Sequence, residues 1–136
     1  MIRRIFSPPT LPDPASWGVL ILRVGMGFFM ATHGYDKLSS YLGGNSGFAD
    51  PIGLGEETSL ILTIFSEFFC ALLLMLGLFT RAALIPLLIG MLVVSFVVHG
   101  GEPLSEREHA LMFAVAFVAI FLTGPGRYSA DQVLFK

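Results

Sequence analysis

The amino-acid sequence predicts an all-α integral membrane protein, a four-helix antiparallel bundle that forms a single domain over residues 1–136. Apolar residues make up 54% of the 136 positions, charged residues make up only 13%, and the mean hydropathy is +0.78. A soluble domain has about 45–50% apolar and about 25% charged residues, so this chain is expected to lie in a lipid bilayer. Four spans of about 20 residues would use about 80 residues and leave only short loops, which excludes a second domain.

The first span is predicted at about residues 15–38, in an apolar stretch that carries Arg23. Asp13 followed by Pro14 is typical of a helix N-cap and first turn. Trp17 would then lie at the headgroup boundary, where tryptophan is enriched in membrane proteins.

A glycine-rich outer loop is predicted at residues 40–57, followed by a second span at about 58–79 that contains Glu67. Almost no connection separates this span from a third one at about 82–99, so the two are expected to form a tight antiparallel hairpin. Pro86 is expected to kink the third span without ending it, because neighbouring helices can satisfy the freed carbonyl.

A fourth span is predicted at about residues 105–123. Ser105 and Glu108 have the spacing of a capping box, in which each side chain satisfies a backbone donor of the first turn. Glycine and proline residues at 124–126 end this helix, and the remainder, 124–136, is expected to be a cytoplasmic tail.

The distribution of Lys and Arg predicts the orientation of the bundle. The loops on one side of the bundle hold only two cations, Lys37 and Arg107. By the positive-inside rule both termini are therefore expected in the cytoplasm. The flanks assigned to the cytoplasmic side hold five cations: Arg3, Arg4, Arg81, Arg127 and Lys136.

Arg23 and Glu67 are the two ionisable residues expected at membrane depth. At about 1.5 Å per residue, they lie roughly 9 Å and 18 Å from the same inner side. A charge at such depth costs at least about 2.5–3.5 kcal/mol, so we expect a pair across the first two spans or contacts with Thr63 and Ser66. Two interpretations stay open, a structural peg and a handle for protons or a ligand.

Four side chains are expected near the outer boundary and are the candidates for contact with a ligand or quinone: His33, Lys37, His99 and His109. Imidazoles can ligate a metal or haem, or donate to a quinone carbonyl. No His-x-x-x-His spacing is present, so no metal site is predicted and a haem is not expected. A quinone contact and the commoner structural role, hydrogen bonds to loop carbonyls, both stay open.

The sequence contains little else that supports catalysis. Cys70 is the only cysteine, so neither a disulfide within the chain nor a Cys-x-x-Cys redox pair is available. There is no nucleophile elbow and no phosphate-binding glycine loop. The formal charge of -2 offers no basic excess, which excludes nucleic acid as a partner.

Three segments resemble the DoxX family of small four-helix membrane proteins: LRVGMGFFMATHGYDKL at 22–38, SEFFCALLLMLGLFTR at 66–81 and GPGRYSAD at 124–131. Phe68, Phe69 and Ala71 depart from the family pattern, in which small glycines often follow the glutamate. This departure puts in question any cavity beside Glu67. The polar and glycine positions that match in order are Arg23, His33, Gly34, Lys37, Glu67, Gly77, Thr80, Arg81, Gly126, Arg127, Ser129 and Asp131.

The resemblance implies a multi-pass protein of the bacterial inner (plasma) membrane, similar to the membrane subunit of thiosulfate:quinone oxidoreductase and to relatives found with superoxide dismutase and sulfurtransferase. It implies a subunit of a quinone-linked oxidoreductase system of thiosulfate or thiol and oxidative-stress metabolism. A soluble redox partner would supply the electrons. Two questions stay open: whether the chain forms a homo-oligomer, and whether it is itself catalytic. The alternatives are a non-catalytic scaffold that recruits a soluble redox enzyme, and a small-solute carrier, which would need a water-accessible cavity reaching Glu67.

Overall fold

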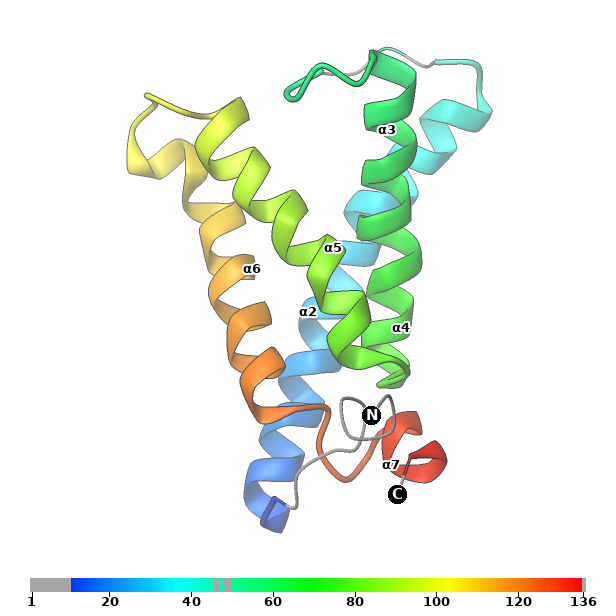
Figure 1. Ribbon diagram of the computed structural model, residues 1–136, viewed down its shortest axis with the longest axis vertical. Helices are drawn as coiled ribbons and strands as arrows, with labels where there is room; N and C mark the ends of the chain where they lie inside the picture. The colour runs from blue at the N-terminus through cyan, green and yellow to red at the C-terminus, as the bar shows by residue number, and fades with distance from the viewer. Residues whose placement is uncertain (1–10, 46, 48–49, 136) are drawn as a thin grey trace.

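The computed structural model describes residues 11–45, 47 and 50–135, and every regular element in these residues is a helix (Figure 1). The predicted all-α class is therefore confirmed. Arg3, Arg4 and Lys136, which contribute to the predicted orientation, lie outside the described residues, and that orientation stays a prediction. The elements are α2 (Asp13–Leu42), α3 (Glu56–Ile64), η1 (Phe65–Cys70), α4 (Ala71–Leu76), α5 (Thr80–Val93), η2 (Val94–Val98), α6 (Leu104–Thr123) and α7 (Ala130–Leu134).

In the described part of the chain, three helical stretches are long and apolar enough to cross a membrane: Asp13–Leu42, Glu56–Leu76 and Thr80–Val98. The second stretch joins α3, η1 and α4, and the third joins α5 and η2. α6 has 20 residues, but charged residues at 106–108 interrupt the apolar character of its first turns. A fourth membrane span at α6 therefore stays a prediction.

The helices form two halves that meet at one end of the molecule (Figure 1). In one half, α2 packs against η1 and α4, and in the other, α5 and η2 pack against α6. The halves are close at the end that holds α7, which we call the α7 end. They splay apart at the opposite end, which we call the loop end because it holds the connections 43–55 and 99–103 (Figure 1).

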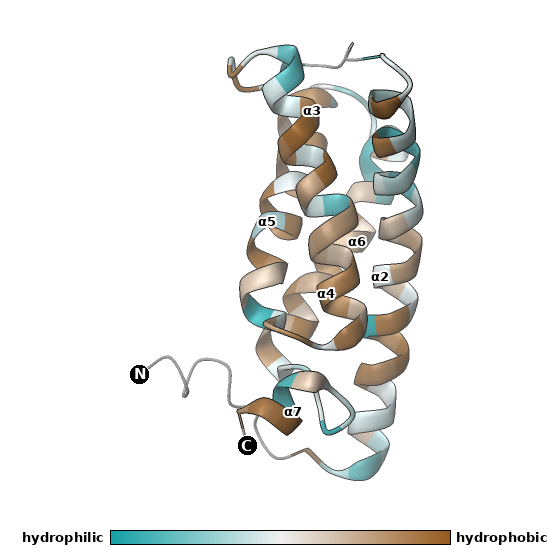
Figure 2. Ribbon diagram, turned by 90° about the vertical axis from the view of Figure 1, so that its right-hand side faces the viewer, coloured by the Kyte–Doolittle hydropathy of each residue, from teal (hydrophilic) through white to brown (hydrophobic). Residues whose placement is uncertain are grey.

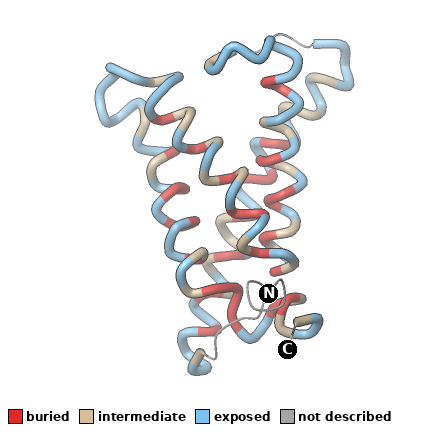
Figure 3. The backbone as a smooth tube through the Cα atoms, in the orientation of Figure 1, coloured by how far each residue is buried: buried red, intermediate tan, exposed pale blue. Residues whose placement is uncertain are grey.

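Large apolar side chains cover both the inside and the outside of the bundle. Hydrophobic residues predominate along the helices, and many helix positions on the outer faces are exposed (Figures 2 and 3). Exposure of such a continuous apolar surface to water is unfavourable, whereas contact with lipid acyl chains is favourable. The buried core includes Met30, Leu74, Leu84, Leu87, Phe117 and Ile120, and the exposed set includes Ile21, Phe29, Ile85, Val115 and Leu122.

Glycine allows α2 to approach the second stretch very closely. A Cβ atom on Gly34 would lie 2.5 Å from the backbone carbonyl carbon of Glu67, and a Cβ on Gly27 would lie 2.6 Å from Cγ of Met75. Small residues of this kind let membrane helices gain dispersion contacts between their backbones. The approach at Gly34 fixes the distance between α2 and the turn that carries Glu67.

Two helix starts differ from the predicted caps. α2 begins at Asp13 itself after Pro12, and α6 begins at Leu104 after Pro103. No side chain accepts a hydrogen bond from the first turn of either helix, so the predicted Asp13 cap and the capping box at 105–108 are wrong. The ring of each preceding proline restricts its φ angle. This restriction lowers the entropy cost of starting the helix, so the helix can start there without a polar cap.

The hairpin between the second and third stretches is tight, as predicted. α4 ends at Leu76 and α5 begins at Thr80, and Gly77 supplies the left-handed backbone conformation, with φ of 70°, that ends α4. α5 continues through Pro86, which confirms that this proline does not end the helix.

The segment after α6 folds back onto the α7 end of the bundle. The backbone N–H groups of Phe79 and Thr80 donate to the two carboxylate oxygens of Asp131, at 2.7 and 2.9 Å. The backbone N–H of Asp131 donates to the carbonyl of Gly77 at 2.9 Å. Asp131 is 1% exposed and satisfies N–H groups at the start of α5, so residues 124–135 are part of the packed structure and not a free tail.

Candidate functional site

A cavity of about 660 Å³ lies between the two halves toward the loop end. Its walls come from α2, α3 and η1 on one side and from α5, η2 and α6 on the other, and residues of the 43–55 connection also line it. This volume is within the usual range for pockets that hold small ligands, about 300–1,000 Å³. The splayed arrangement of the halves in Figure 1 therefore leaves space for a small molecule.

All four residues predicted as ligand candidates line this one cavity: His33, Lys37, His99 and His109. They come from three different helical stretches, and the structure brings them together because each lies near the loop end of its helix. Glu67 lines the same cavity. Their roles in binding stay predictions.

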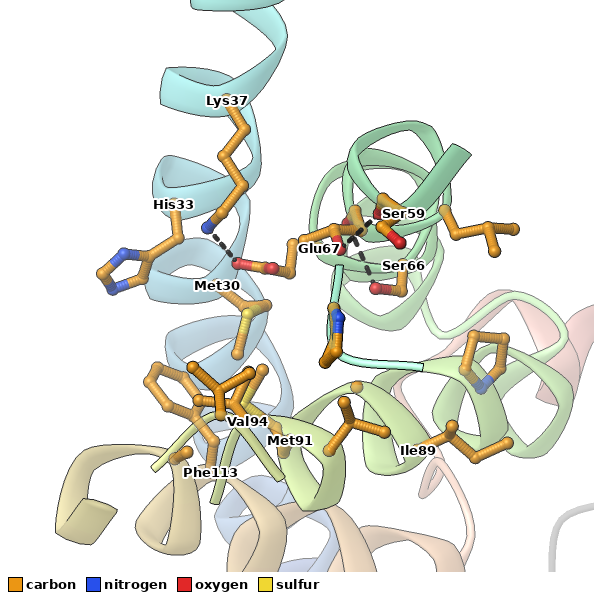
Figure 4. A pocket seen from close by; sticks show the side chains of 18 of the residues that line it. Met30, His33, Lys37, Ser59, Ser66, Glu67, Ile89, Met91, Val94 and Phe113 are labelled. Atoms are coloured by element: carbon orange, nitrogen blue, oxygen red, sulfur yellow. Dashed lines mark hydrogen bonds and ion pairs between the residues drawn. The ribbon is translucent and has the colours of Figure 1, made fainter. Parts of the chain in front are cut away.

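Lys37 and Glu67 form an ion pair on the wall of the cavity (Figure 4). The ammonium nitrogen of Lys37 lies 2.8 Å from a carboxylate oxygen of Glu67. The side chain of Glu67 is only 7% exposed, whereas that of Lys37 is 29% exposed. The lysine therefore neutralises a carboxylate that would otherwise be buried without a counter-charge.

The predicted pair between Arg23 and Glu67 is wrong. The guanidinium of Arg23 lies at the α7 end and donates to the carbonyl of Pro125, to that of Tyr128 at 2.8 Å and to that of Met75 at 3.4 Å. The carbonyl of Met75 is in the last turn of α4, and those of Pro125 and Tyr128 lie in the connection between α6 and α7, where backbone carbonyls lack a helical partner. Arg23 is 1% exposed and binds the returning C-terminal segment to the bundle.

The helical turn that carries Glu67 is a π-helix, η1, which continues α3 and leads into α4. A π turn contains an extra residue relative to an α-helix and shifts the direction of the side chains that follow. A second π-helix, η2, lies on the opposite wall and is continuous with α5. Such turns are frequent at functional sites, and the apolar sequence pattern gave no signal for either of them.

Hydroxyl groups lie beside Glu67 and contribute polar atoms to the same wall. The hydroxyl of Thr63 donates to the carbonyl of Ser59 at 2.8 Å, and the hydroxyl of Ser66 donates to the carbonyl of Thr63 at 3.1 Å. Each hydroxyl oxygen can still accept a hydrogen bond. These side chains supply acceptors to the cavity, while Lys37 supplies donors.

The histidines lie at the edge of the cavity and not around one point. The rings of His33 and His109 have centroids 5.2 Å apart, and each also lies near the ring of Phe113. His99 pairs with Glu102 at 2.8 Å. Within the described residues, no group of three His, Cys, Asp or Glu side chains is arranged to hold a metal ion.

Apolar side chains form the rest of the cavity. Met91, Val94 and Phe113 lie below the Lys37–Glu67 pair in the view of Figure 4. The phenylalanines that depart from the family pattern do not fill the space, since Phe69 is 52% exposed on the outer surface. A cavity beside Glu67 is therefore present, and its largely apolar lining is interrupted by Lys37 and Glu67 on one wall and by His99, Glu106 and His109 on the other.

Comparison with known proteins gives two matches to the chain. The model of the DoxX family matches residues 18–100. The inner membrane protein YqjF of Escherichia coli (strain K12) is 30% identical over 125 residues, which cover 88% of this chain and 93% of that protein. No solved structure matches the chain.

Proposed function

This chain belongs to the DoxX family and is a multi-pass protein of the bacterial inner membrane, and we propose that it binds a quinone as the membrane subunit of a quinone-linked oxidoreductase system. The observation that carries this proposal is the Lys37–Glu67 pair on the wall of an otherwise largely apolar cavity. A few placed polar groups in an apolar pocket are the usual arrangement for orienting a small ligand.

The chemistry of the two side chains matches that of a quinone head group. A quinone presents carbonyl acceptors on an apolar ring, and its reduction to the quinol takes up two electrons and two protons. The ammonium of Lys37 can donate to one carbonyl, and the carboxylate of Glu67 can accept from the hydroxyl of the quinol. His33 and His109 supply further donors at the edge of the cavity.

The electrons are proposed to come from a soluble partner. Cys70 is the only cysteine and is buried, so it forms no dithiol that could supply an electron pair. The proposed role of the chain is to bind and orient the quinone and to exchange protons with it. Arg81 and Arg127 near the α7 end support a cytoplasmic location for that end, which would place the cavity toward the outer surface.

Quinone binding is tested with protein purified gently together with its lipids. We expect mass spectrometry to find more quinone than in an unrelated multi-pass protein from the same membranes, and added decylubiquinone to raise the melting temperature. Glu67→Gln is expected to weaken binding at least about tenfold, which corresponds to about 1.4 kcal/mol. Absence of both the bound quinone and the thermal shift in the unmodified protein contradicts the proposal.

Glu57→Gln is the matched control for that variant. Glu57 is exposed, accepts a hydrogen bond from Tyr41 and does not line the cavity, yet it undergoes the same change of charge. We expect it to bind decylubiquinone as the unmodified protein does. If Glu67→Gln does not fold, the double variant Lys37→Gln/Glu67→Gln replaces it, since it removes both charges and leaves neither of them buried without a partner.

A small-solute carrier is the second candidate, and one observation favours it, because the cavity reaches Glu67. Transport would also require a path to the α7 end, where Leu84, Leu87 and Phe117 are fully buried. Solute flux across proteoliposomes that stops in Glu67→Gln, with no binding of quinone, would favour the carrier.

A further inference from the structure

The cavity lies between two seams, and aromatic rings bridge one of them. Between α2 and α6, the ring of His33 lies 5.2 Å from that of His109, and the ring of Phe113 lies 5.2 Å from His109 and 6.3 Å from His33. These rings come from both halves of the bundle. His33 and His109 are both exposed and line the cavity, so this seam presents polar rings to whatever enters from outside.

The other seam, between α3 and α5, has a different character. α3 packs against α2 and η1, while α5 packs against η1, α4 and α6. Along this seam, residues that line the cavity are also exposed on the outside: Leu62 is 49% exposed, Phe65 is 46% exposed and Ile89 is 57% exposed. This seam is therefore an apolar opening of the cavity, whereas the exposed lining residues between α2 and α6, His33 and His109, are polar.

This opening faces lipid. Leu62 and Phe65 belong to the stretch Glu56–Leu76, and Ile89 belongs to Thr80–Val98, both of which are long and apolar enough to cross a membrane. Apolar side chains at this depth meet acyl chains and not water. The seam therefore connects the polar wall at Lys37 and Glu67 with the hydrocarbon region.

An apolar loop covers the cavity at the loop end. Pro51, Ile52 and Leu54 line the cavity from the 43–55 connection. The carboxylate of Asp50 holds this loop in place, since it accepts from the backbone N–H of Gly55 at 3.1 Å and from the hydroxyl of Ser59 at 3.2 Å. The loop thus contributes apolar side chains to the cavity at this end, beside the exposed polar side chains of Glu106 and His109.

We propose that the cavity exchanges its ligand with the lipid phase through the seam between α3 and α5, and that the ligand is a membrane-dissolved amphiphile whose apolar tail lies in this seam. The polar head of the amphiphile lies at the Lys37–Glu67 pair, and its identification as a quinone rests on the function proposed above. The lipid-side opening itself rests only on the residues of the seam and the loop.

Fluorescence quenching tests the opening without any assumption about the head group. Trp17 is the only tryptophan, so a Trp17→Phe background allows one new tryptophan to be placed in the cavity with Val94→Trp. Ile85→Trp in the same background is the matched control, because Ile85 lies on α5, is 51% exposed and does not line the cavity. Both variants are reconstituted in phosphatidylcholine vesicles with or without brominated acyl chains, and iodide is added as a quencher from water.

We expect brominated chains to quench the tryptophan in Val94→Trp about as strongly as in Ile85→Trp, and to quench both more strongly than iodide does. Protection of Val94→Trp from brominated chains, or stronger quenching of it by iodide than by brominated chains, overturns the proposal. If Val94→Trp does not fold, Val93→Trp, at a partly buried position that also lines the cavity, is used in the same way.

A second measurement separates the opening from the function. Decylubiquinone and a quinone with the same head but no tail are compared in unmodified protein, Ile89→Trp and Ile85→Trp. We expect the preference for the tailed quinone to fall at least tenfold in Ile89→Trp only, because the larger ring crowds the seam. Partition of each quinone into detergent is the same for all three proteins and therefore does not change the comparison. An unchanged preference in Ile89→Trp overturns the placement of the tail. If neither quinone binds the unmodified protein, the proposed function is overturned, and the quenching result still tests the opening.

Discussion

The ammonium of Lys37 and the carboxylate of Glu67 lie 2.8 Å apart and join α2 to η1 across the wall of the cavity. The pair is asymmetric, because the carboxylate is almost fully buried while the lysine reaches partly into solvent-accessible space. Loss of the lysine and loss of the glutamate should therefore have different consequences.

Lys37→Met leaves the Glu67 carboxylate buried without a partner, and we expect it to lower the free energy of unfolding by about 1–3 kcal/mol. Glu67→Gln should cost less, since the lysine can turn toward solvent. Unfolding of purified protein by detergent titration measures both. Arg127→Met is the control, because it breaks the exposed Arg127–Asp13 pair, which is worth about 0–1 kcal/mol. Equal losses in Lys37→Met and Arg127→Met would contradict the burial of the Glu67 charge.

Gly34→Ala should separate α2 from η1. The added Cβ would lie 2.5 Å from the carbonyl carbon of Glu67 and from the amide nitrogen of Phe68, and neither backbone atom can move aside as a side chain can. We expect a loss of about 1–3 kcal/mol, the usual cost of overpacking, measured as a lower melting temperature. Gly25→Ala is the matched control on the same helix, since a Cβ there meets nothing within 4 Å. A destabilised Gly25→Ala with an unaffected Gly34→Ala would refute the close approach.

Asp131→Ala should destabilise the protein without affecting the cavity. It removes the acceptor for the N–H groups of Phe79 and Thr80, and loss of such a cap costs about 0.5–2 kcal/mol. The melting temperature should fall, while the affinity for decylubiquinone in the folded protein stays the same, because the cap lies at the opposite end from the cavity. Asp13→Ala, at an exposed carboxylate, serves as control. A specific loss of quinone affinity in Asp131→Ala would show that the two ends are coupled.

Cys70 should report on global unfolding. It is 2% exposed within the core, so we expect maleimide to modify the native protein at least about tenfold more slowly than the protein unfolded in strong detergent. In a Cys70→Ala background, a cysteine placed at Ser105, which is exposed at the loop end, should react at similar rates in both states. Fast reaction of Cys70 in the native protein would contradict the packing of η1.

The sequence predicted the helices well because their boundaries depend on local chemistry. Gly43 follows the end of α2, and Gly77 takes the left-handed conformation that ends α4. The sequence also predicted that His33, His99 and His109 lie at one level, because position along a helix predicts depth in the membrane, but it did not predict that they line one cavity.

The partners of the buried charges did not follow from sequence. Depth alone gives no position around a helix, and the π turn at Glu67 changes the side-chain direction that an α-helix would give. The long side chain of Lys37 also reaches Glu67 from a residue that we placed at the outer boundary. For Arg23, the missing information was that residues 124–135 fold back, for which the cluster Gly126, Ser129 and Asp131 was the available signal.

The attachment of Arg23 to Pro125 and Tyr128 has a consequence for biogenesis. A ribosome makes the arginine more than a hundred residues before the carbonyls that accept its hydrogen bonds. Throughout elongation, the guanidinium must therefore stay hydrated or rest at the insertion machinery, because a bare charge in lipid is costly. A chain that ends before Pro125 lacks two of the three carbonyls that accept hydrogen bonds from Arg23, and its guanidinium keeps only the contact with Met75.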